Sequence, residues 1–551
     1  MKVAIAQNNY HVGNIESNTN KIIEQIKKAR EHQADLVVFS ELAICGYPPL
    51  DLLEQKSFIE KSQKAINNIL MYVDDIAVIV GAPSINNAPE GKKLYNSAYV
   101  LENGQISQIV HKTLLPTYDV FDEYRYFEAN EIPETVEIKG HTIALTICED
   151  LWDEQPVDQP FAQSRLYRKA PMKKLIANDP ELIINIAASP FSYNQEQKRK
   201  GILKRNAHDY QVPLIYVNQV GGNTDIIFDG ASKVLNTHGE IVQQLSRFEE
   251  DFEIITIERI KKQSALMVEK LESRIQQIHN AVVMGIRDYF QKSGFDKAVL
   301  GLSGGIDSAV VASLACKALG AQNVHGLLMP SEFSSDHSVS DAELLAKNLG
   351  MPYHTIAIKD IYNSVNSAMA PIFTDKTFDV TEENIQARIR GLLLMAYSNK
   401  HGHMLLNTSN KSEAAVGYST LYGDTNGGLS PIGDVYKSDV YALARYINHT
   451  GEFIPTGSIE KPPSAELRPD QQDSDSLPDY SVLDRMLFEF IERKQSIDDI
   501  IGMGFNKSDV LKVTHLVNIN EYKRFQFPPI LRVSSKAFGA GRRLPIVAKY
   551  D

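Results

Sequence analysis

Short apolar runs separated by amphipathic stretches recur along the chain. In the first half the runs are VAIAQ, LVVFSE, IAVIVGAP, HTIALTIC, LIINIAAS and LIYVNQVGG, and their Val and Ile content is typical of buried strands. Between the first two runs, Ile22, Ile23, Ile26 and Ala29 recur at helical spacing. From about residue 276 a second series begins, with AVLGL, VHGLLMP, YHTIAI and HMLLNTS. This alternation of strands and helices predicts α/β domains built on parallel strands.

The pattern divides the chain of 551 residues into two predicted domains. Residues 1–257 form the first and residues 276–551 the second, and the charged, helix-prone segment 258–275 is interpreted as a connector. A chain of this length typically holds about 2 to 4 domains. Residues 460–480 are rich in Pro, Ser and Asp, which is typical of a flexible loop.

Composition narrows the class of protein. The net charge of −12 argues against a nucleic-acid partner, because phosphate backbones favour a basic face. No run approaches the 18 or so apolar residues that span a membrane, and the first apolar run is too short for a signal peptide. The three cysteines, Cys45, Cys148 and Cys316, fit a reducing compartment better than a disulfide framework. We therefore expect a cytoplasmic protein without membrane or nucleic-acid partners.

A glycine-rich turn, SGGIDS, lies between an apolar run and a helix-like run. Gly304 and Gly305 allow a tight turn that presents N–H groups to an anion, and a helix expected to start near Ser308 adds its positive end. Asp307 would repel phosphate unless it holds a metal ion. The turn lacks the lysine of a nucleotide-hydrolase loop, and by itself it is equally compatible with an ordinary strand–helix connection.

This turn resembles the SGGxDS loop of the N-type ATP pyrophosphatases. The resemblance implies that ATP is a co-substrate and is cleaved between its α- and β-phosphates. The residues that it places on ATP are Gly301, Leu302, Ser303, Gly304, Gly305, Ile306, Asp307 and Ser308.

The segments downstream resemble NAD synthetases. The similar segments are residues 407–440, NIQARIRG at 384–391, residues 460–480 and residues 522–546. The resemblance implies that Thr408, Lys437 and Ser464 contact ATP, and that Asp307 and Glu413 hold Mg²⁺. It implies dinucleotide contacts for Asn384, Arg388, Glu413, Asp424 and Lys523, with Asp424 and Lys437 on loops. Residues 460–480 would then be an ordered part of the site.

Three candidate catalytic residues in the first half follow strand-like runs. They are Glu41 in FSELAICGY, Lys112 in HKTLLP and Cys148 in LTICEDLW. Side chains at the ends of strands in one sheet can converge, so a carboxylate base could activate the thiol while an ammonium stabilises the developing anions. Taken singly, Cys is often a buried hydrophobe, and Glu and Lys are usually solvated.

These fragments resemble the nitrilase, or carbon–nitrogen hydrolase, superfamily, and CEDLW is similar to the glutaminase domain of glutamine-dependent NAD synthetases. The resemblance implies that Glu41 is the base, Lys112 the anion stabiliser and Cys148 the nucleophile, with Glu123 bracing them. It implies a glutamine pocket lined by Tyr118, Glu149, Ser189 and Gln195, although the family favours a basic residue at position 195.

The two resemblances together imply an ATP-dependent amidation of deamido-NAD (nicotinic acid adenine dinucleotide) to NAD through an acyl-adenylate. The first domain should be a four-layer αββα sandwich, and the second a parallel sheet like that of the adenine nucleotide α-hydrolases. They also imply a protected ammonia tunnel and at least a homodimer. Two alternatives stay open, namely an amidotransferase or thiolation enzyme acting on transfer RNA, and a non-enzymatic dinucleotide sensor.

Overall fold

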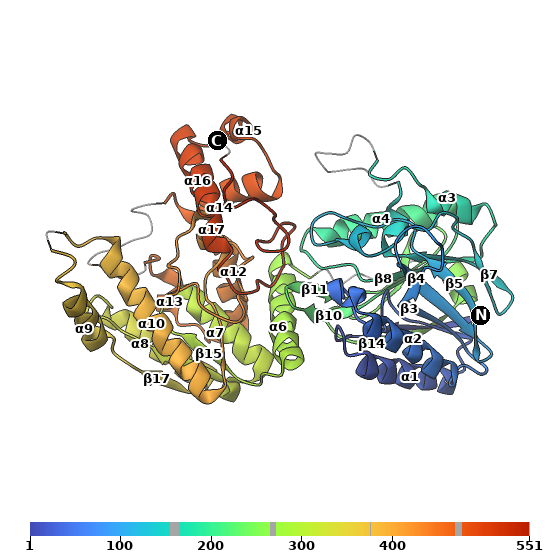
Figure 1. The fold of residues 1–551 in the computed structure, drawn as a ribbon, viewed down its shortest axis with the longest axis horizontal. Helices are drawn as coiled ribbons and strands as arrows, with labels where there is room; N and C mark the ends of the chain where they lie inside the picture. The colour runs from blue at the N-terminus through green and yellow to red at the C-terminus, as the bar shows by residue number, and fades with distance from the viewer. Residues whose placement is uncertain (155–164, 265–271, 375, 465, 469–476, 550–551) are drawn as a thin grey trace. The chain divides into compact units, whose positions relative to one another are not determined.

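The structure, a computed structural model, describes residues 1–154, 165–264, 272–374, 376–464, 466–468 and 477–549 (Figure 1). The chain divides into two compact units, Met1–Leu271 and Glu272–Asp551. The predicted connector 258–275 crosses this division. It covers most of α5 (Ile257–Lys262) and the start of α6 (Arg274–Ser293), while residues 265–271 lie outside the described part. The predicted limits of the connector stay a prediction.

The first unit is built on two six-stranded sheets and a hairpin. One sheet has the order β14-β1-β2-β3-β4-β5 and the other the order β13-β12-β9-β8-β7-β6. The strands of the first sheet are β1 (Lys2–Gln7), β2 (Leu36–Val38), β3 (Ala77–Ile85), β4 (Leu94–Glu102), β5 (Gln105–His111) and β14 (Asp251–Thr256). Those of the second are β6 (Val136–Ile138), β7 (His141–Ile147), β8 (Leu182–Ala187), β9 (Leu214–Asn218), β12 (Lys233–Leu235) and β13 (Ile241–Gln244). The hairpin pairs β10 (Val220–Asn223) with β11 (Ile226–Asp229).

Two hydrophobic cores define four layers in this unit. One core fills the space between the sheets, and extends to α3 (Pro171–Ile176) and α4 (Gln195–Tyr210) on the outer side of the second sheet. The other core packs α1 (Ile15–Glu31) and α2 (Lys56–Leu70) on the first sheet. The predicted helical stripe of α1 is buried there, since Ile22, Ile26 and Ala29 have no exposed surface. The predicted αββα sandwich is therefore confirmed.

The second unit holds a four-stranded sheet of order β17-β16-β15-β18, with parallel pairing throughout. Its strands are β15 (Ala298–Gly301), β16 (Val324–Leu328), β17 (Tyr353–Thr355) and β18 (Met404–Leu405). Its further helices are α7 (Ile306–Leu319), α8 (Asp336–Leu349), α9 (Lys359–Met369), α10 (Val380–His401), α11 (Lys411–Val416), α12 (Lys437–Ile447), α13 (Thr456–Glu460), α14 (Tyr480–Leu487), α15 (Ile497–Gly502), α16 (Lys507–Ile519) and α17 (Glu521–Arg524). The predicted parallel α/β domain is confirmed.

Strand ends place the candidate residues of both units. In the first unit, Glu41, Lys112 and Cys148 follow β2, β5 and β7. In the second, β15 has β16 on one side and β18 on the other, so the chain reverses its direction of sheet growth at β15. Ligands of open parallel sheets bind at the carboxyl ends of strands at such a switch point. No helix in the described ranges combines the length and apolarity needed to cross a membrane.

Candidate active sites

A buried charge cluster forms the first candidate site. Lys112 Nζ lies 2.7 Å from Glu41 Oε1 and 2.8 Å from Glu123 Oε1, and none of the three side chains is more than 5% exposed. Glu41 also accepts hydrogen bonds from Asn96 Nδ2 (2.7 Å) and from the backbone N–H of Ala188 (2.9 Å). Burial raises the pKa of Glu123 to about 7, and the Glu41 charge adds to this effect while Lys112 opposes it. Burial by itself lowers the pKa of Lys112, but the two carboxylates hold it well above its ordinary value.

Cys148 lies at the turn that follows β7, beside this cluster. Its backbone φ is 44°, in the left-handed region that non-glycine residues rarely adopt. Burial and the charge of Glu41 raise the pKa of its thiol well above the ordinary value, and Lys112 opposes the rise. The side chain is therefore a neutral thiol until a nearby base takes its proton. The structure thus brings together Glu41, Lys112, Glu123 and Cys148, as the sequence predicts.

A second buried carboxylate lies next to Cys148 in the sequence. Glu149 is buried, and its Oε1 accepts hydrogen bonds from the hydroxyls of Tyr118 (2.7 Å) and Tyr167 (2.8 Å). The backbone N–H of Ser189 donates to Asn218 Oδ1 at 2.8 Å. Gln195 is the first residue of α4, and no hydrogen bond in the described part of the chain joins it to Glu149 or Tyr118. Its predicted contact with glutamine stays a prediction.

Sequence reasoning missed three residues that hold this site together. The Asp150 carboxylate accepts hydrogen bonds from three backbone N–H groups of the segments that carry Lys112 and Cys148. Tyr47 donates to Glu123 Oε1 at 2.8 Å, and Tyr167 is the second partner of Glu149. Asp150 could have been found from the sequence, because it is an acidic residue only two positions after Cys148. The two tyrosines are distant from the residues that they contact, so the sequence gives no signal for them.

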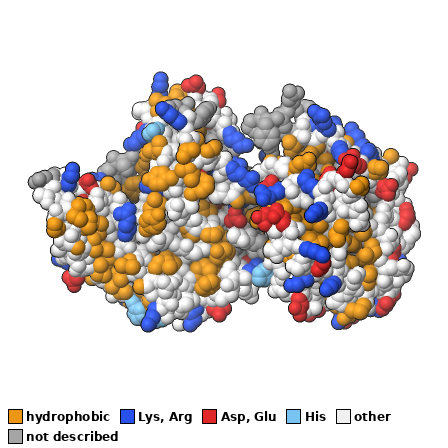
Figure 2. Space-filling view, in the orientation of Figure 1, with side chains coloured by type: hydrophobic (Ala, Val, Ile, Leu, Met, Phe, Trp, Pro, Cys, Tyr) orange, Lys and Arg blue, Asp and Glu red, His pale blue; other side chains and the backbone are white. Residues whose placement is uncertain are grey.

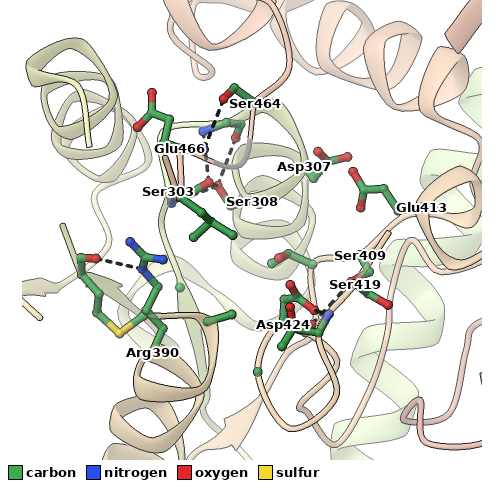
Figure 3. Close-up of a pocket in the computed structure, with 18 of the residues that line it drawn as sticks. Ser303, Asp307, Ser308, Arg390, Ser409, Glu413, Ser419, Asp424, Ser464 and Glu466 are labelled. Carbon is green, nitrogen blue, oxygen red and sulfur yellow. Dashed lines mark hydrogen bonds between the residues drawn. The ribbon is translucent and has the colours of Figure 1, made fainter. Parts of the chain in front are cut away.

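A pocket with a volume of about 500 Å³ forms the second candidate site, at the carboxyl ends of β15, β16 and β18. Figure 3 shows side chains from the loop after β15 facing others from later in the chain across this pocket. Most of the predicted contacts line it, namely Gly301, Leu302, Ser303, Gly305, Ile306, Asp307, Ser308, Asn384, Thr408, Glu413, Asp424, Lys437, Ser464 and Lys523. Gly304 and Arg388 are not among its lining residues.

The SGGIDS turn has the geometry of an anion-binding loop. Its helix, α7, begins at Ile306, two residues earlier than expected. Ser308 Oγ lies 3.2 Å from Ser303 Oγ and donates to the Gly305 carbonyl at 3.0 Å, which fixes the turn. Gly304 has a φ of +79°, and a Cβ there would lie 2.2 Å from the Ser338 carbonyl oxygen. Only glycine fits this position, so Gly304 shapes the loop while its neighbours face the pocket.

Two carboxylates and one lysine meet beside this turn. Lys437 Nζ forms an ion pair with Asp307 and lies 3.3 Å from Glu413 Oε1. The prediction that Lys437 lies on a loop was wrong, because Lys437 is the first residue of α12 and is buried. Burial lowers its pKa, but the two carboxylates outweigh burial and hold it above the ordinary value. Oxygen ligands from one or two carboxylates suit Mg²⁺ when substrate phosphates complete the shell, so this pair fits the ion. No group of three or more His, Cys, Asp or Glu suited to a metal occurs among the described residues.

Of the residues predicted for the dinucleotide, Asn384 and Arg388 lie on α10, Glu413 on α11, Asp424 in the 417–426 segment and Lys523 on α17. Asn384 Oδ1 accepts from Thr420 Oγ1 at 2.7 Å, and Asp424 Oδ1 accepts from the Thr420 backbone N–H. Burial raises the pKa of Asp424 to about 6. Lys523 Nζ donates to the carbonyls of Gly417 (2.7 Å) and Ser419 (2.8 Å). The structure therefore brings Asn384, Asp424 and Lys523 around one segment.

The 460–480 segment is described only in part, because residues 465 and 469–476 lie outside the described ranges. Ser464 lines the pocket, as do Lys461 and Glu466, which sequence reasoning missed. Glu466 Oε1 accepts from Lys461 Nζ and from Ser338 Oγ, both at 2.7 Å. The described part of the segment is thus attached to α8 beside the phosphate-type loop.

The fold and the two sites define a protein in which a carbon–nitrogen hydrolase unit precedes an NAD synthase unit. The family model described as carbon-nitrogen hydrolase matches residues 2–265, and that described as NAD synthase matches residues 278–527. The chain belongs to the glutamine-dependent NAD(+) synthetase family. It is 46% identical to the glutamine-dependent NAD(+) synthetase of Synechocystis sp., over 100% of this chain and 99% of the relative.

Further relatives support the same family. The glutamine-dependent NAD(+) synthetase of Aquifex aeolicus is 40% identical over the whole of both chains. The solved structure of the Acinetobacter baumannii glutamine-dependent NAD+ synthetase in complex with ADP is 39% identical, with a TM-score of 0.78 over 99% of this chain and 98% of that one. A structure of the glutamine-dependent NAD(+) synthetase of Cytophaga hutchinsonii, at 22% identity and a TM-score of 0.82, covers 100% of this chain and 98% of its own, and supports the fold.

Proposed function

We propose that this chain converts deamido-NAD to NAD, with ATP as the activating substrate and glutamine as the source of nitrogen. The observation that supports it best is the presence, in one chain of this family, of a buried Glu–Lys–Cys centre and a separate pocket lined by an SGGIDS loop. The names of its relatives support the same reaction, and one relative binds ADP. We also propose a cytoplasmic location, which the small number of cysteines supports. NAD formation in the assay below separates this reaction from the rival roles on transfer RNA or as a sensor.

In the first unit, glutamine is hydrolysed at Cys148. Glu41 takes the thiol proton as the sulfur attacks the side-chain amide carbon, and the same proton then goes to the departing ammonia. Lys112 stabilises the oxyanion that forms during the attack. Glu149, held by Tyr118 and Tyr167, supplies a buried negative charge for the α-ammonium group of glutamine. Water then hydrolyses the thioester, which releases glutamate and restores Cys148.

In the second unit, the dinucleotide carboxylate attacks the α-phosphorus of ATP, and pyrophosphate leaves. Ser303, Gly305 and Ser308, with the N-terminus of α7, bind the phosphates through N–H and hydroxyl donors. Asp307 and Glu413 would hold Mg²⁺, which supplies positive charge to the phosphates when it is bound. Lys437 adds a fixed positive charge beside them. Ammonia then attacks the acyl carbon, and AMP leaves with one former carboxylate oxygen.

An oxygen-labelling experiment tests this chemistry. Purified protein is incubated with glutamine, ATP and deamido-NAD carrying ¹⁸O in its carboxylate, and the products are analysed by mass spectrometry. We expect NAD, AMP and pyrophosphate, with one label in AMP. Label in inorganic phosphate, together with ADP, would show an acyl phosphate and overturn the proposed cleavage site. Absence of NAD formation would support the sensor alternative instead.

We also propose that the chain forms a homo-oligomer through its second unit. Figure 2 shows hydrophobic side chains gathered over the part of that unit where α9 and α10 lie. Phe378 at the approach to α10, and Val380 and Leu392 on the helix, are each more than half exposed. Exposed apolar side chains that gather in this way commonly mark association surfaces. Light scattering on the wild type and on Leu392→Lys tests this, because the substitution should lower the mass of the particle.

A further inference from the structure

Arg390 is a pocket-lining cation that has no role in the mechanism described above. It lies on α10, where Ala387, Arg390 and Leu394 are spaced by three and four residues and all line the pocket. Arg388, which the sequence suggested for the site, is exposed, and its Nε–H donates to the Leu421 carbonyl at 3.2 Å. The helix therefore presents Arg390 to the pocket in place of Arg388.

The guanidinium of Arg390 is held at one point and is otherwise unmatched. Its Nε–H donates to the Met329 carbonyl at 3.0 Å, and no ion pair joins it to a carboxylate in the described part of the chain. By contrast, Lys437 and Lys461 both have carboxylate partners. Burial lowers the pKa of Arg390 to about 10, although Glu466 and Asp424 raise it. A buried guanidinium with a single hydrogen bond is stabilised by a ligand that covers its plane or accepts hydrogen bonds from its remaining N–H groups.

The neighbours of Arg390 place it next to the start of the phosphate-type loop. A Cβ on Gly301 would lie 3.4 Å from Met329 Cε and 3.6 Å from Leu394 Cδ1. Gly301 ends β15, two residues before Ser303. Figure 3 shows Arg390 on the side of Ser303 and apart from Asp424 and Ser409. An apolar wall of this kind beside a phosphate loop suits a purine base.

We propose that Arg390 binds the adenosine end of ATP, with its guanidinium plane against the purine ring. The hydrogen bond from Nε to Met329 lies in the guanidinium plane, so it fixes the plane and leaves the faces to a stacking partner. Arginine stacks on aromatic rings better than lysine, because its charge is spread over a flat, weakly hydrated group. This role deepens the function proposed above and rests on ATP binding in this pocket.

Two half-ligands of ATP test the contact. Adenosine and magnesium pyrophosphate are titrated by calorimetry into protein saturated with deamido-NAD, so that the dinucleotide fills its own adenosine subsite. Arg390→Met should weaken adenosine binding about 5- to 30-fold and change pyrophosphate binding less than about twofold. The adenosine affinity of Arg390→Lys should lie between those of Arg390→Met and the wild type. Arg493→Met, which removes an exposed arginine outside the pocket, should match the wild type.

Steady-state kinetics provides a second readout. The KM for ATP should rise in Arg390→Met and Arg390→Lys, while the KM for deamido-NAD and the glutaminase rate stay near wild type. Weaker pyrophosphate binding with normal adenosine binding would place Arg390 on the phosphates and overturn the purine contact. Normal adenosine binding by folded Arg390→Met would overturn it as well, yet leave the proposed function intact. Wild-type protein that binds neither half-ligand and forms no NAD would overturn both.

Discussion

The Asp150 carboxylate accepts a hydrogen bond from the backbone N–H of Leu114, with 2.8 Å between Oδ1 and N. The same oxygen accepts from the N–H of Thr113 at 3.0 Å, and Oδ2 accepts from that of Ile147 at 3.1 Å. Lys112 directly precedes Thr113, and Cys148 directly follows Ile147. One buried carboxylate therefore fixes the distance between the segment that carries the lysine and the segment that carries the thiol.

Asp150→Asn should lower the rate of glutamine hydrolysis about 10- to 100-fold, because even a shift of about 1 Å between reacting groups is costly. The amide keeps one acceptor oxygen but turns an N–H₂ group toward a backbone donor, so at least one of the three hydrogen bonds is lost. NAD synthesis from added ammonium salt should stay near wild type. Asp153→Asn is the matched control, because Asp153 is a neighbouring buried aspartate that binds the backbone N–H of Met172 instead. Equal losses with both nitrogen sources would contradict the positioning role.

Lys112→Met should abolish most glutaminase activity, with a loss of about 100- to 1,000-fold, because it removes the cation expected to stabilise the oxyanion. It also leaves Glu41 and Glu123 buried without their cation, which typically costs about 3–5 kcal/mol of stability. Folding is therefore checked by circular dichroism, and ammonia-dependent synthesis serves as an internal measure of the intact second unit. Lys139→Met is a suitable control, since the Lys139 ammonium is exposed and donates to the Asp75 carbonyl. Near-normal glutamine hydrolysis by folded Lys112→Met would disprove the assignment.

Cys148→Ala should stop NAD synthesis from glutamine and leave synthesis from ammonium salt largely intact. The substitution removes the nucleophile but little volume, so the cost in stability should be about 1 kcal/mol. A steady-state assay with each nitrogen source checks this outcome. Glutamine use by the folded variant would mean that another nucleophile exists.

Glu413→Ala should give the opposite pattern, with synthesis lost from both nitrogen sources and glutaminase activity retained. Glu413 lies with Asp307 and Lys437 at the phosphate end of the pocket, where it is proposed to hold Mg²⁺. Magnesium titration followed by pyrophosphate release measures the loss directly, because the variant should need more of the ion. Retention of normal ammonia-dependent synthesis would show that the metal is held elsewhere.

His325 should make the second unit sensitive to acid. Its ring lies 4.8 Å from that of His354 and 6.3 Å from that of His403, and its buried Nε2 has no hydrogen-bond partner among the residues that the structure describes. Burial and the neighbouring histidines lower its pKa from 6.5 to about 4. The unfolded chain therefore binds a proton that the folded chain excludes, so stability should fall as the pH drops from about 6.5 toward 4.

Thermal unfolding at pH 7 and pH 5 measures this effect on the wild type and on His325→Phe. The phenylalanine ring fills similar space without titrating, so the variant should lose less stability on acidification. A difference on the order of 1 kcal/mol corresponds to about 2–4 °C in Tm for a unit of this size. An identical acid shift in both proteins would assign the sensitivity to other groups, among them His403, whose pKa is also lowered by burial.

The sequence by itself determined the two α/β units, and most of the contact residues that it predicted for the second site do line the pocket. Short apolar runs rich in Val and Ile favour buried strands, and residues just after parallel strands of one sheet meet at one edge of that sheet. Glu41, Lys112 and the SGGIDS turn follow strands β2, β5 and β15 in agreement with that rule. Cys148 follows β7, which belongs to the other six-stranded sheet, so the prediction that all three catalytic residues lie on one sheet was wrong. The strands β4 and β5 were overlooked, because the apolar run AYVL in β4 is short and the apolar residues of QISQIVH in β5 are interrupted by polar ones.

Only the tertiary structure decided which side chains complete each site. Arg388 and Arg390 are two residues apart on one helix, and the packing of α10 turns the second toward the pocket and the first toward Leu421. Tyr47 reaches Glu123 across 76 residues of sequence, and Lys437 reaches Asp307 across 130. Sequence patterns record local periodicity, whereas these contacts depend on how distant elements pack. That packing is set by the summed burial of whole faces, which no single residue in the sequence reveals.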